Sequence, residues 1–301
     1  MYNFKSKYLF YFLIIIYGLT ISSCIKDVDY KLDFEGSKMV VFAGGVAGQK
    51  LSTQITRTIA PLTKVDNPDS LVVSDALIEI VKNNDVVDTM ISQGEGKYIS
   101  HITLQENNVY KIKINSEGEL LESGYDTVPV PALINSIKIT EFSEEKDTTN
   151  SYDFTFMYKI QIYKSVQFPY NDISLTLFAN GKEYEDYVFL SSKNEFVECD
   201  NCFNLLDNPC TKYLGNNIYE ITNEKTVYSP EYKLKDLDSI QFILNTYSSL
   251  SDRLCQSGMD LEEYYGNPLP FVSNPSVMFS NIEGGYGIFL LGASDSLTIK
   301  L

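Results

Sequence analysis

Four cysteines in the second half of the chain have the residue type and spacing for metal binding or for disulfides. Cys199, Cys202 and Cys210 form a C-x-x-C-x₇-C pattern, and Cys255 follows later. Thiolates at such spacing bind zinc in a reducing compartment, whereas an even number of cysteines in an exported protein indicates disulfides. We favour two disulfides, one of them tying the 199–210 loop to Cys255, with zinc or free thiols as the alternatives. The spacing leaves the pairing open.

His101 is the only histidine, so any catalytic triad or Cys–His pair would have to use it. It lies between Ser100 and Ile102 in an expected strand, and the sequence has no G-x-S-x-G pattern. We therefore interpret it as a surface or half-buried strand residue and assign no catalytic residue. A single histidine also excludes histidine-rich metal sites, and we expect no bound metal or cofactor.

Carboxylates form two local clusters beside tyrosines: Glu183, Glu185 and Asp186, and then Asp260, Glu262 and Glu263. A glycoside hydrolase requires two carboxyl groups opposed across a sugar, about 5–10 Å apart. Spacing along the chain cannot establish such opposition. We interpret both clusters as solvated loops and strand edges and keep a carboxylate-based glycan hydrolase as the third functional hypothesis. No EF-hand loop is present.

Cys24 is the residue whose chemistry is best defined. Lys5 and Lys7 precede an apolar run at residues 8–17, and Ile21-Ser22-Ser23-Cys24 resembles a lipobox. This order is typical of a signal peptide, and the apolar run is shorter than the roughly 20 residues of a spanning helix. We expect cleavage after residue 23 and lipid on Cys24, since two or three acyl chains anchor stably where one does not. A plain signal peptide is the alternative.

The residues after the cysteine, Ile25-Lys26-Asp27-Val28-Asp29, are similar to the signal that sends Bacteroidota lipoproteins to the outer face of the outer membrane. We expect residues 24–37 to be a lipidated tether and the protein to face the cell exterior. Cleavage removes two lysines and changes the formal net charge from −16 to −18. Such a charge disfavours nucleic-acid binding, because phosphates are neutralised by lysine and arginine.

Six tripeptides fit Asp, then Ser or Thr, then an aliphatic residue, Met or Thr, which resembles the O-glycosylation pattern of exported Bacteroidota proteins. Their second residues are Ser70, Thr89, Thr127, Thr148, Ser239 and Ser296. A glycan requires a solvated site. Thr148, in a polar turn, is the best candidate, and Ser70 and Thr89 are the next two.

The elements that carry these residues are mainly strands. Short alternating runs occur at 38–42, 51–59, 76–81, 86–91, 96–99, 109–114 and 120–127, separated by turn signals such as Asn83-Asn84-Asp85 and Ser116-Glu117-Gly118. This pattern predicts an immunoglobulin-like or transthyretin-like sandwich over residues 38–130. Val128-Pro129-Val130-Pro131 stiffens the junction, and we place the domain boundary there.

A second β-rich domain with one or two short helices is expected over residues 131–301. Its strands are predicted at 134–142, 152–163, 172–178, 183–190, 239–244, 288–291 and 296–301, with a polar turn at 144–151 and an Asn180-Gly181 hairpin tip. Residues 248–257 form the helix candidate, with Ser248 or Ser249 as N-cap and Gly258 as C-cap.

The run from Ser280 to Phe289 (SNIEGGYGIF), preceded by Asn267-Pro268 and Pro275, resembles the ending of a Bacteroidota lipoprotein family, domain of unknown function 4249 (DUF4249). The segments 38–41, 73–76, 96–98 and 128–131 fit the same family. The ending is also similar to that of SusD-like nutrient-binding lipoproteins. The chain departs from the family pattern at 198–214, where its cysteines lie, and in its helix, which has no Trp.

The resemblance implies an outer-membrane lipoprotein, often encoded beside a TonB-dependent receptor, with no established activity. Gly284, Gly285 and Gly287 allow either a turn that packs the last strand or a lid over a ligand, and we favour the turn. The leading hypothesis is a non-enzymatic accessory to a TonB-dependent transporter that captures or admits a small ligand. The alternative is a structural or adhesive surface protein.

Overall fold

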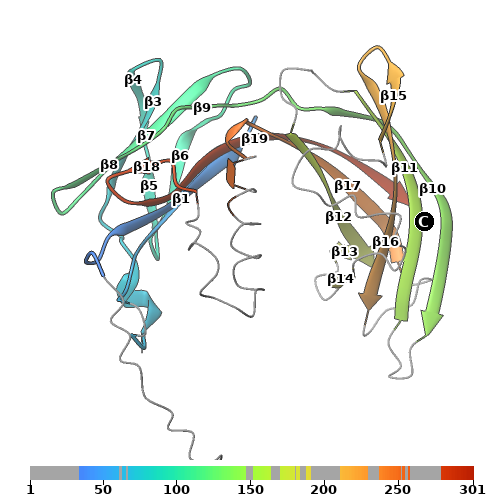
Figure 1. Cartoon of the computed structure of the whole chain (residues 1–301), viewed down its shortest axis with the longest axis horizontal. Helices are drawn as coiled ribbons and strands as arrows, with labels where there is room; N and C mark the ends of the chain where they lie inside the picture. Colours follow the sequence, from blue (N-terminus) through green and yellow to red (C-terminus); the bar gives the residue numbers. More distant parts are fainter. Residues whose placement is uncertain are drawn as a thin grey trace, which may run out of the picture. The chain divides into compact units, whose positions relative to one another are not determined.

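The computed structural model describes residues 34–60, 63–65, 67–146, 152–163, 170–179, 181–183, 188–190, 211–229, 237–251, 253–254, 257 and 279–301. The protein is mainly β, as predicted, and residues 37–59 and 64–301 form one compact unit that contains all of the described strands (Figure 1). Cys24, Thr148, Cys199, Cys202, Cys210 and Cys255 lie outside the described residues.

The first part of the chain supplies nine strands and one short 3₁₀ helix. They are β1 (Met39–Val46), β2 (Lys50–Arg57), η1 (Pro68–Leu71), β3 (Leu77–Lys82), β4 (Asp85–Thr89), β5 (Ile91–Gly94), β6 (Lys97–Thr103), β7 (Val109–Ser116), β8 (Glu119–Ser123) and β9 (Asp126–Thr127). The predicted strand over 120–127 is wrong in one respect, because it is divided into β8 and β9.

The second part supplies the remaining strands. They are β10 (Leu133–Lys146), β11 (Tyr152–Tyr163), β12 (Tyr170–Ala179), β13 (Lys182–Glu183), β14 (Val188–Leu190), β15 (Thr211–Gly215), β16 (Ile218–Ser229), β17 (Leu237–Tyr247), β18 (Ile282–Glu283) and β19 (Tyr286–Lys300). After β17, residues 250, 251, 253, 254 and 257 are helical, within the predicted helix.

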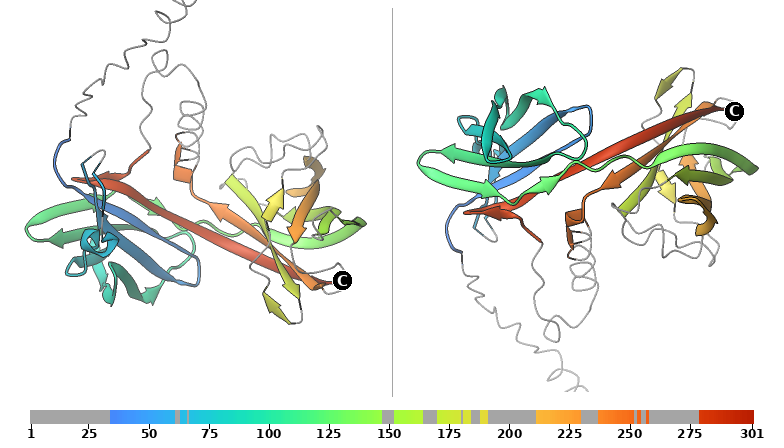
Figure 2. Two further views of the ribbon diagram at one scale, coloured as in Figure 1. Left: turned by 90° about the horizontal axis from the view of Figure 1, so that it is seen from below. Right: turned by 90° about the horizontal axis from the view of Figure 1, so that it is seen from above.

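Three sheets result. The largest has the order β13-β12-β17-β19-β1-β2-β6-β5, the second β10-β11-β16-β14 with β15 beside β16, and the third β18-β8-β7-β3-β4 with β9 beside β7. The last strand, β19, lies between β17 and β1 (Figure 2). It is antiparallel to β17 and parallel to β1. The last strand and the first strand, β19 and β1, are therefore neighbours in the same sheet.

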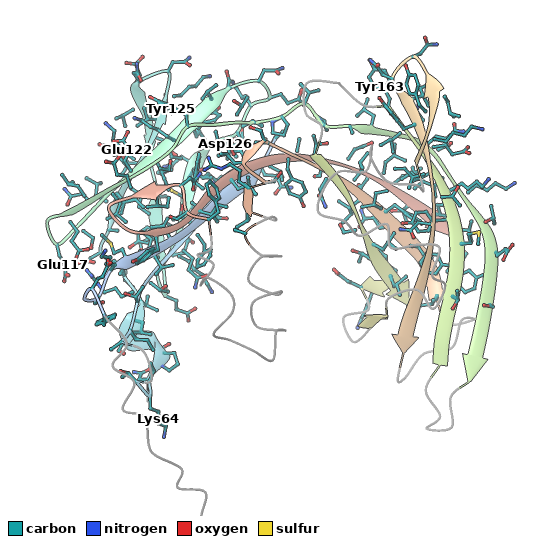
Figure 3. The ribbon with its side chains drawn as sticks, viewed as in Figure 1. Lys64, Glu117, Glu122, Tyr125, Asp126 and Tyr163 are labelled. Atoms are coloured by element: carbon teal, nitrogen blue, oxygen red, sulfur yellow. The ribbon has the colours of Figure 1, made fainter. Side chains whose placement is uncertain are left out.

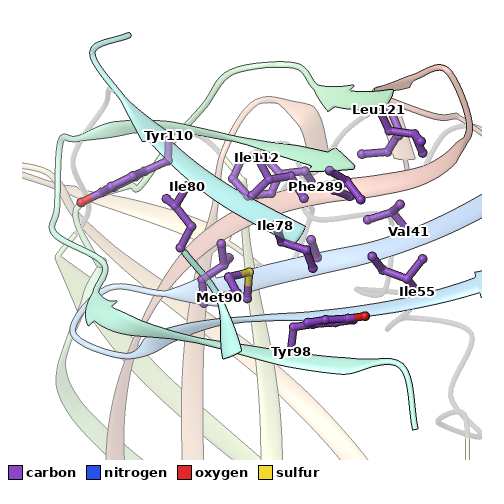
Figure 4. Close-up of a cluster of buried hydrophobic side chains, with 14 of the residues drawn as sticks. Val41, Ile55, Ile78, Ile80, Met90, Tyr98, Tyr110, Ile112, Leu121 and Phe289 are labelled. Carbon is purple, nitrogen blue, oxygen red and sulfur yellow. The ribbon is translucent and has the colours of Figure 1, made fainter. Parts of the chain in front are cut away.

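Side-chain alternation builds a sandwich from the first part. Val41 and Ile55 of the large sheet face Ile78, Ile112 and other side chains of the third sheet, and all are fully buried (Figure 4). Burying each such side chain contributes about 1.5–3 kcal/mol to folding. β19 supplies Phe289 and Leu291 to this core, so the C-terminal range of the chain is part of its hydrophobic interior.

A second core forms between the other half of the large sheet and the five-stranded sheet. Tyr158 and Ile160 of β11 pack with Phe242 and Leu244 of β17, and the rings of Tyr158 and Phe242 meet edge-on at 5.0 Å between centroids. Ile299 of β19 packs against this core. Residues 289, 291 and 299 share one face of β19, so a single strand faces both cores.

The hairpin turns follow from their sequences. Asn83-Asn84 and Glu117-Gly118 have positive φ at both central residues. This is the conformation of the tight type I′ turn, which Asn and Gly adopt with the least strain. The predicted β3–β4 hairpin and the predicted turn at 116–118, which connects β7 to β8, are both confirmed.

Candidate functional site

The family-like segment 280–287 forms a turn that docks the last strand. The side chain of Asn281 accepts a hydrogen bond from the N–H of Phe289 and donates one to its carbonyl, both at 2.8 Å. Gly287 has φ +119°, and a Cβ there would lie 1.9 Å from the carbonyl oxygen of Val41. The expected turn is confirmed, and the glycines serve close backbone packing.

Glu283 is the acidic residue of this segment, and its side chain is exposed. It lies in β18 and pairs in register with Glu122 of β8, which in turn pairs with Lys113 of β7. Like charges directly opposite each other in a sheet are destabilising. Two neighbouring hollows share Glu122 and Glu283 in their linings.

The larger hollow measures about 660 Å³ and lies over the outer side of β3, β7 and β8. Leu77 and Leu120 line it, and they are 50% and 73% exposed. Asn115 separates the two leucines in the register of the sheet, and Glu79 and Lys113 form the next row. The surface is thus a shallow mixture of apolar and charged groups.

The smaller hollow measures about 480 Å³ and lies between the 280–283 segment and the start of the helix after β17. Its polar groups include Arg253, Glu122 and Glu283, and its rings are Tyr125 and Phe279. The guanidinium of Arg253 lies over the ring of Phe279, 4.4 Å from its centroid. This stacking holds the planar guanidinium in a defined orientation.

Lys111 supports one wall of the smaller hollow. Its ammonium bonds to the carboxylate of Glu122 and lies 4.5 Å from the ring centroid of Tyr125. The hydrogen bond from Lys111 lowers the pKa of Glu122, and the same bond raises the pKa of Lys111. Glu122 therefore stays ionised, whereas a general acid for glycoside hydrolysis requires a raised pKa. Glu122 and Tyr125, both labelled in Figure 3, line this hollow together.

Among the described carboxyl groups, Asp126 has the most strongly shifted pKa. It is buried, accepts hydrogen bonds from the N–H groups of Leu291 and Thr127 at 2.7 and 2.8 Å, and bonds to the hydroxyl of Ser248. Burial raises the pKa of Asp126 to about 6, although these hydrogen bonds lower it in part. Because its oxygens accept hydrogen bonds from the backbone of β9 and β19, we assign Asp126 the structural role of joining these two strands.

His101 has a structural partner that spacing did not reveal. Its Nδ1 lies 3.0 Å from Oδ1 of Asp88, whose Oδ2 accepts hydrogen bonds from the N–H groups of His101 and Ile102. The His101 side chain is 59% exposed and that of Asp88 only 8%. The prediction of a surface or half-buried strand histidine is confirmed, and Asp88 accepts hydrogen bonds from the N–H groups of β6 beyond its pairing with β5.

The glycosylation candidates differ in their surroundings. Ser70 lies exposed in η1, where its hydroxyl donates to the carbonyl of Asn67 at 2.7 Å. Thr89 is exposed at the end of β4, next to the sequestered Asp88.

Of the predicted carboxylate clusters, only Glu183 is described, and it is exposed in β13. Within the described part of the chain, no three His, Cys, Asp or Glu side chains are placed to hold a metal ion. Likewise, none of the described helical residues belong to a helix long and apolar enough to cross a membrane.

The comparisons with known proteins bear on the whole chain. No curated protein matches it. A family model described as a domain of unknown function, DUF4249, matches residues 25–298, which is nearly all of the sequence after the predicted signal peptide. The chain therefore belongs to the DUF4249 family.

Proposed function

We propose that this protein is a lipid-anchored outer-membrane protein that captures a small ligand for a TonB-dependent transporter and performs no catalysis itself. The observation that carries the proposal is the smaller hollow, which is lined by Arg253 and Glu283 and lies beside the 280–287 turn. Hollows of roughly 300–1,000 Å³ with a few convergent polar groups are typical of small-molecule sites.

Rigidity supports a binding role for this hollow. The 280–287 turn is fixed by Asn281 on Phe289 and by the close contact of Gly287 with Val41. A side chain on such a support keeps its position, which lowers the entropy lost on binding. Glu283 projects from this turn, so the turn would present a carboxylate at a constant place.

The location is proposed from the sequence. The lipobox at 21–24 would place the chain in the outer membrane, and the acidic residues after Cys24 would direct it to the outer face. In that oxidising compartment we propose two disulfides among Cys199, Cys202, Cys210 and Cys255. Reducing and non-reducing intact mass measurements should then differ by four hydrogens, and equal masses would exclude both disulfides.

The transporter association is tested by isolation of the protein from native membranes in mild detergent. We expect a TonB-dependent receptor to co-isolate with the wild type and with the double variant Arg253→Gln/Glu283→Gln. A gene-deletion strain should grow poorly on one nutrient class, and the double variant should not restore growth. Repeated isolation without any such receptor would refute the transporter role.

A structural or adhesive role is the second candidate. It is favoured by exposed tyrosines on several strands and loops, since an aromatic ring with a hydroxyl suits contact surfaces. Among the described residues, those that are at least 40% exposed are Tyr125, Tyr163, Tyr213 and Tyr286. This candidate predicts an attachment defect in the deletion strain with normal growth on every nutrient.

A further inference from the structure

The two arginines of the chain have different surroundings. Arg57 forms ion pairs with Glu117 and Glu119 at 3.1 and 3.0 Å, which join the end of β2 to the β7–β8 turn. Arg253 stacks on Phe279, and among the described residues its guanidinium has no carboxylate or other acceptor. A stacked guanidinium keeps its N–H donors available at the edge, the geometry that binds carboxylates in a bidentate manner.

Glu283 is the complementary group on the same hollow. Within the described part of the chain its carboxylate accepts no hydrogen bond and forms no ion pair, whereas Glu122 beside it is held by Lys111. Arg253 and Glu283 therefore line one hollow without pairing with each other. Within the described residues, a positive and a negative group thus line about 480 Å³ without counter-charges.

We propose that this hollow binds a small zwitterion, a free peptide, with the ligand carboxylate on Arg253 and the ligand ammonium on Glu283. The inference rests on the proposed ligand-capture function and names its ligand class. A neutral sugar would leave both charges of the hollow uncompensated. A metal ion bound by the two carboxylates, Glu122 and Glu283, would be repelled by the positive charge of Arg253. Only a ligand with both charges matches the lining.

The test is titration calorimetry on the full-length lipidated protein in detergent, with trialanine as the probe. N-acetyl-trialanine removes the ammonium, and trialanine amide removes the carboxylate. We expect wild-type protein to bind trialanine and to lose about 10-fold or more in affinity for each blocked peptide, since each charge-assisted hydrogen bond contributes at least a factor of this order.

Two variants assign the charges. Glu283→Gln should bind trialanine and its N-acetyl form equally, while it still discriminates against the amide. Arg253→Gln should bind trialanine and the amide equally, while it still discriminates against the N-acetyl form, and Arg253→Lys should be intermediate. Glu106→Gln, an exposed position that lines neither hollow, is the matched control and should behave as wild type.

The ligand class is refuted if wild-type protein gives no binding heat with millimolar trialanine or binds the blocked peptides equally well. Tight binding of trialanine amide would instead show a site for cations and would also overturn the proposal. Thermal unfolding of each variant checks that the fold is kept. Receptor co-isolation is measured separately, so failure of peptide binding and failure of the transporter role are distinguishable.

Discussion

The carboxylate of Asp126 accepts a hydrogen bond from the backbone N–H of Leu291 at 2.7 Å, although 165 residues separate the two. Leu291 lies in the core of the first sandwich, on the same strand that later contacts the second core through Ile299. Nearby, the N–H of Ala132 donates to the hydroxyl of Thr246, and that of Ile134 donates to Asp295. The junction after β9 is thus fastened to β17 and β19 by side chains.

Asp126 gives the first prediction, a pH dependence of stability. Burial raises the pKa of Asp126 from 3.8 to about 6, so folding favours the protonated form. Its contribution is fully present below pH 4 and is lost as the pH rises through 6, by about 3 kcal/mol in total. Urea unfolding of wild type and Asp126→Asn at pH 4 and pH 7 should show the wild type gaining that amount, relative to the variant, at the lower pH.

The control for this experiment is built into the variant. Asparagine keeps the shape but replaces one acceptor oxygen with a donor, so a constant loss at both pH values is expected. Only the difference between the two pH values reports the titration. An equal difference in stability at pH 4 and pH 7 would contradict the raised pKa.

Asp88 should show the opposite sign. Burial raises its pKa, but hydrogen bonds from the N–H groups of His101 and Ile102 and from the His101 ring outweigh this effect, and the net pKa is lowered. Its contribution is therefore present above pH 4 and is lost on further acidification. Asp88→Ala should cost about 1–3 kcal/mol at pH 7, because two N–H groups lose their acceptor.

His101→Ala is the matched variant for Asp88. Its side chain is mostly exposed, and its loss leaves both backbone hydrogen bonds to Asp88 in place. We expect less than about 1 kcal/mol, as is usual for an exposed ion pair. Equal losses of unfolding free energy in the two variants, measured by urea unfolding, would show that Asp88 acts through the imidazole and not through the backbone of β6.

Gly287 should be intolerant of any side chain. Gly287→Ala places a Cβ against the carbonyl of Val41 in a backbone conformation that already disfavours alanine, and we expect a loss of about 3 kcal/mol or more. Gly118 also has a positive φ, +85°, but open space around it, so Gly118→Ala should lose only about 1 kcal/mol. Similar urea midpoints for the two variants would refute the close packing of β1 and β19.

Ser70 is the glycosylation candidate that the structure makes most accessible among those it describes. Both Asp69 and Ser70 are exposed in η1, whereas the aspartates before Thr89 and Thr127 are largely buried. Intact mass measurement of protein from its native host should show a glycan that Ser70→Ala removes and Thr89→Val retains. An unmodified wild-type mass would contradict the motif.

Local patterns predicted most strands well. The run 152–163 matches β11 at both ends, and Asn83-Asn84 gave the β3–β4 hairpin its turn. Pairing overrode local propensity elsewhere. Gly292, Ser294 and Asp295 are weak strand formers and divided the last strand into two in the prediction, yet β19 is continuous because β17 pairs with it there. The strand β10 likewise continues to Lys146, beyond the predicted end at 142.

β15 and β16 were missed, although Gly215-Asn216-Asn217, with positive φ at all three residues, is a turn signal that would have revealed them. The site was less accessible to prediction. Glu283 lies within the family-like segment but was not predicted as a site residue, and Glu122 and Arg253 reach the same hollow from distant parts of the chain. Pairing of β18 with β8 and of β17 with β19 brings them there, and no local pattern encodes these pairings.

The central claim, an acylated Cys24 that anchors a binding protein to the outer membrane, is tested most directly by fatty-acid labelling and membrane fractionation of wild type and Cys24→Ala. We predict that the wild type carries the label and sediments with outer membranes, and that the variant is unlabelled and is not anchored. Equal labelling and equal sedimentation of the two proteins would contradict it.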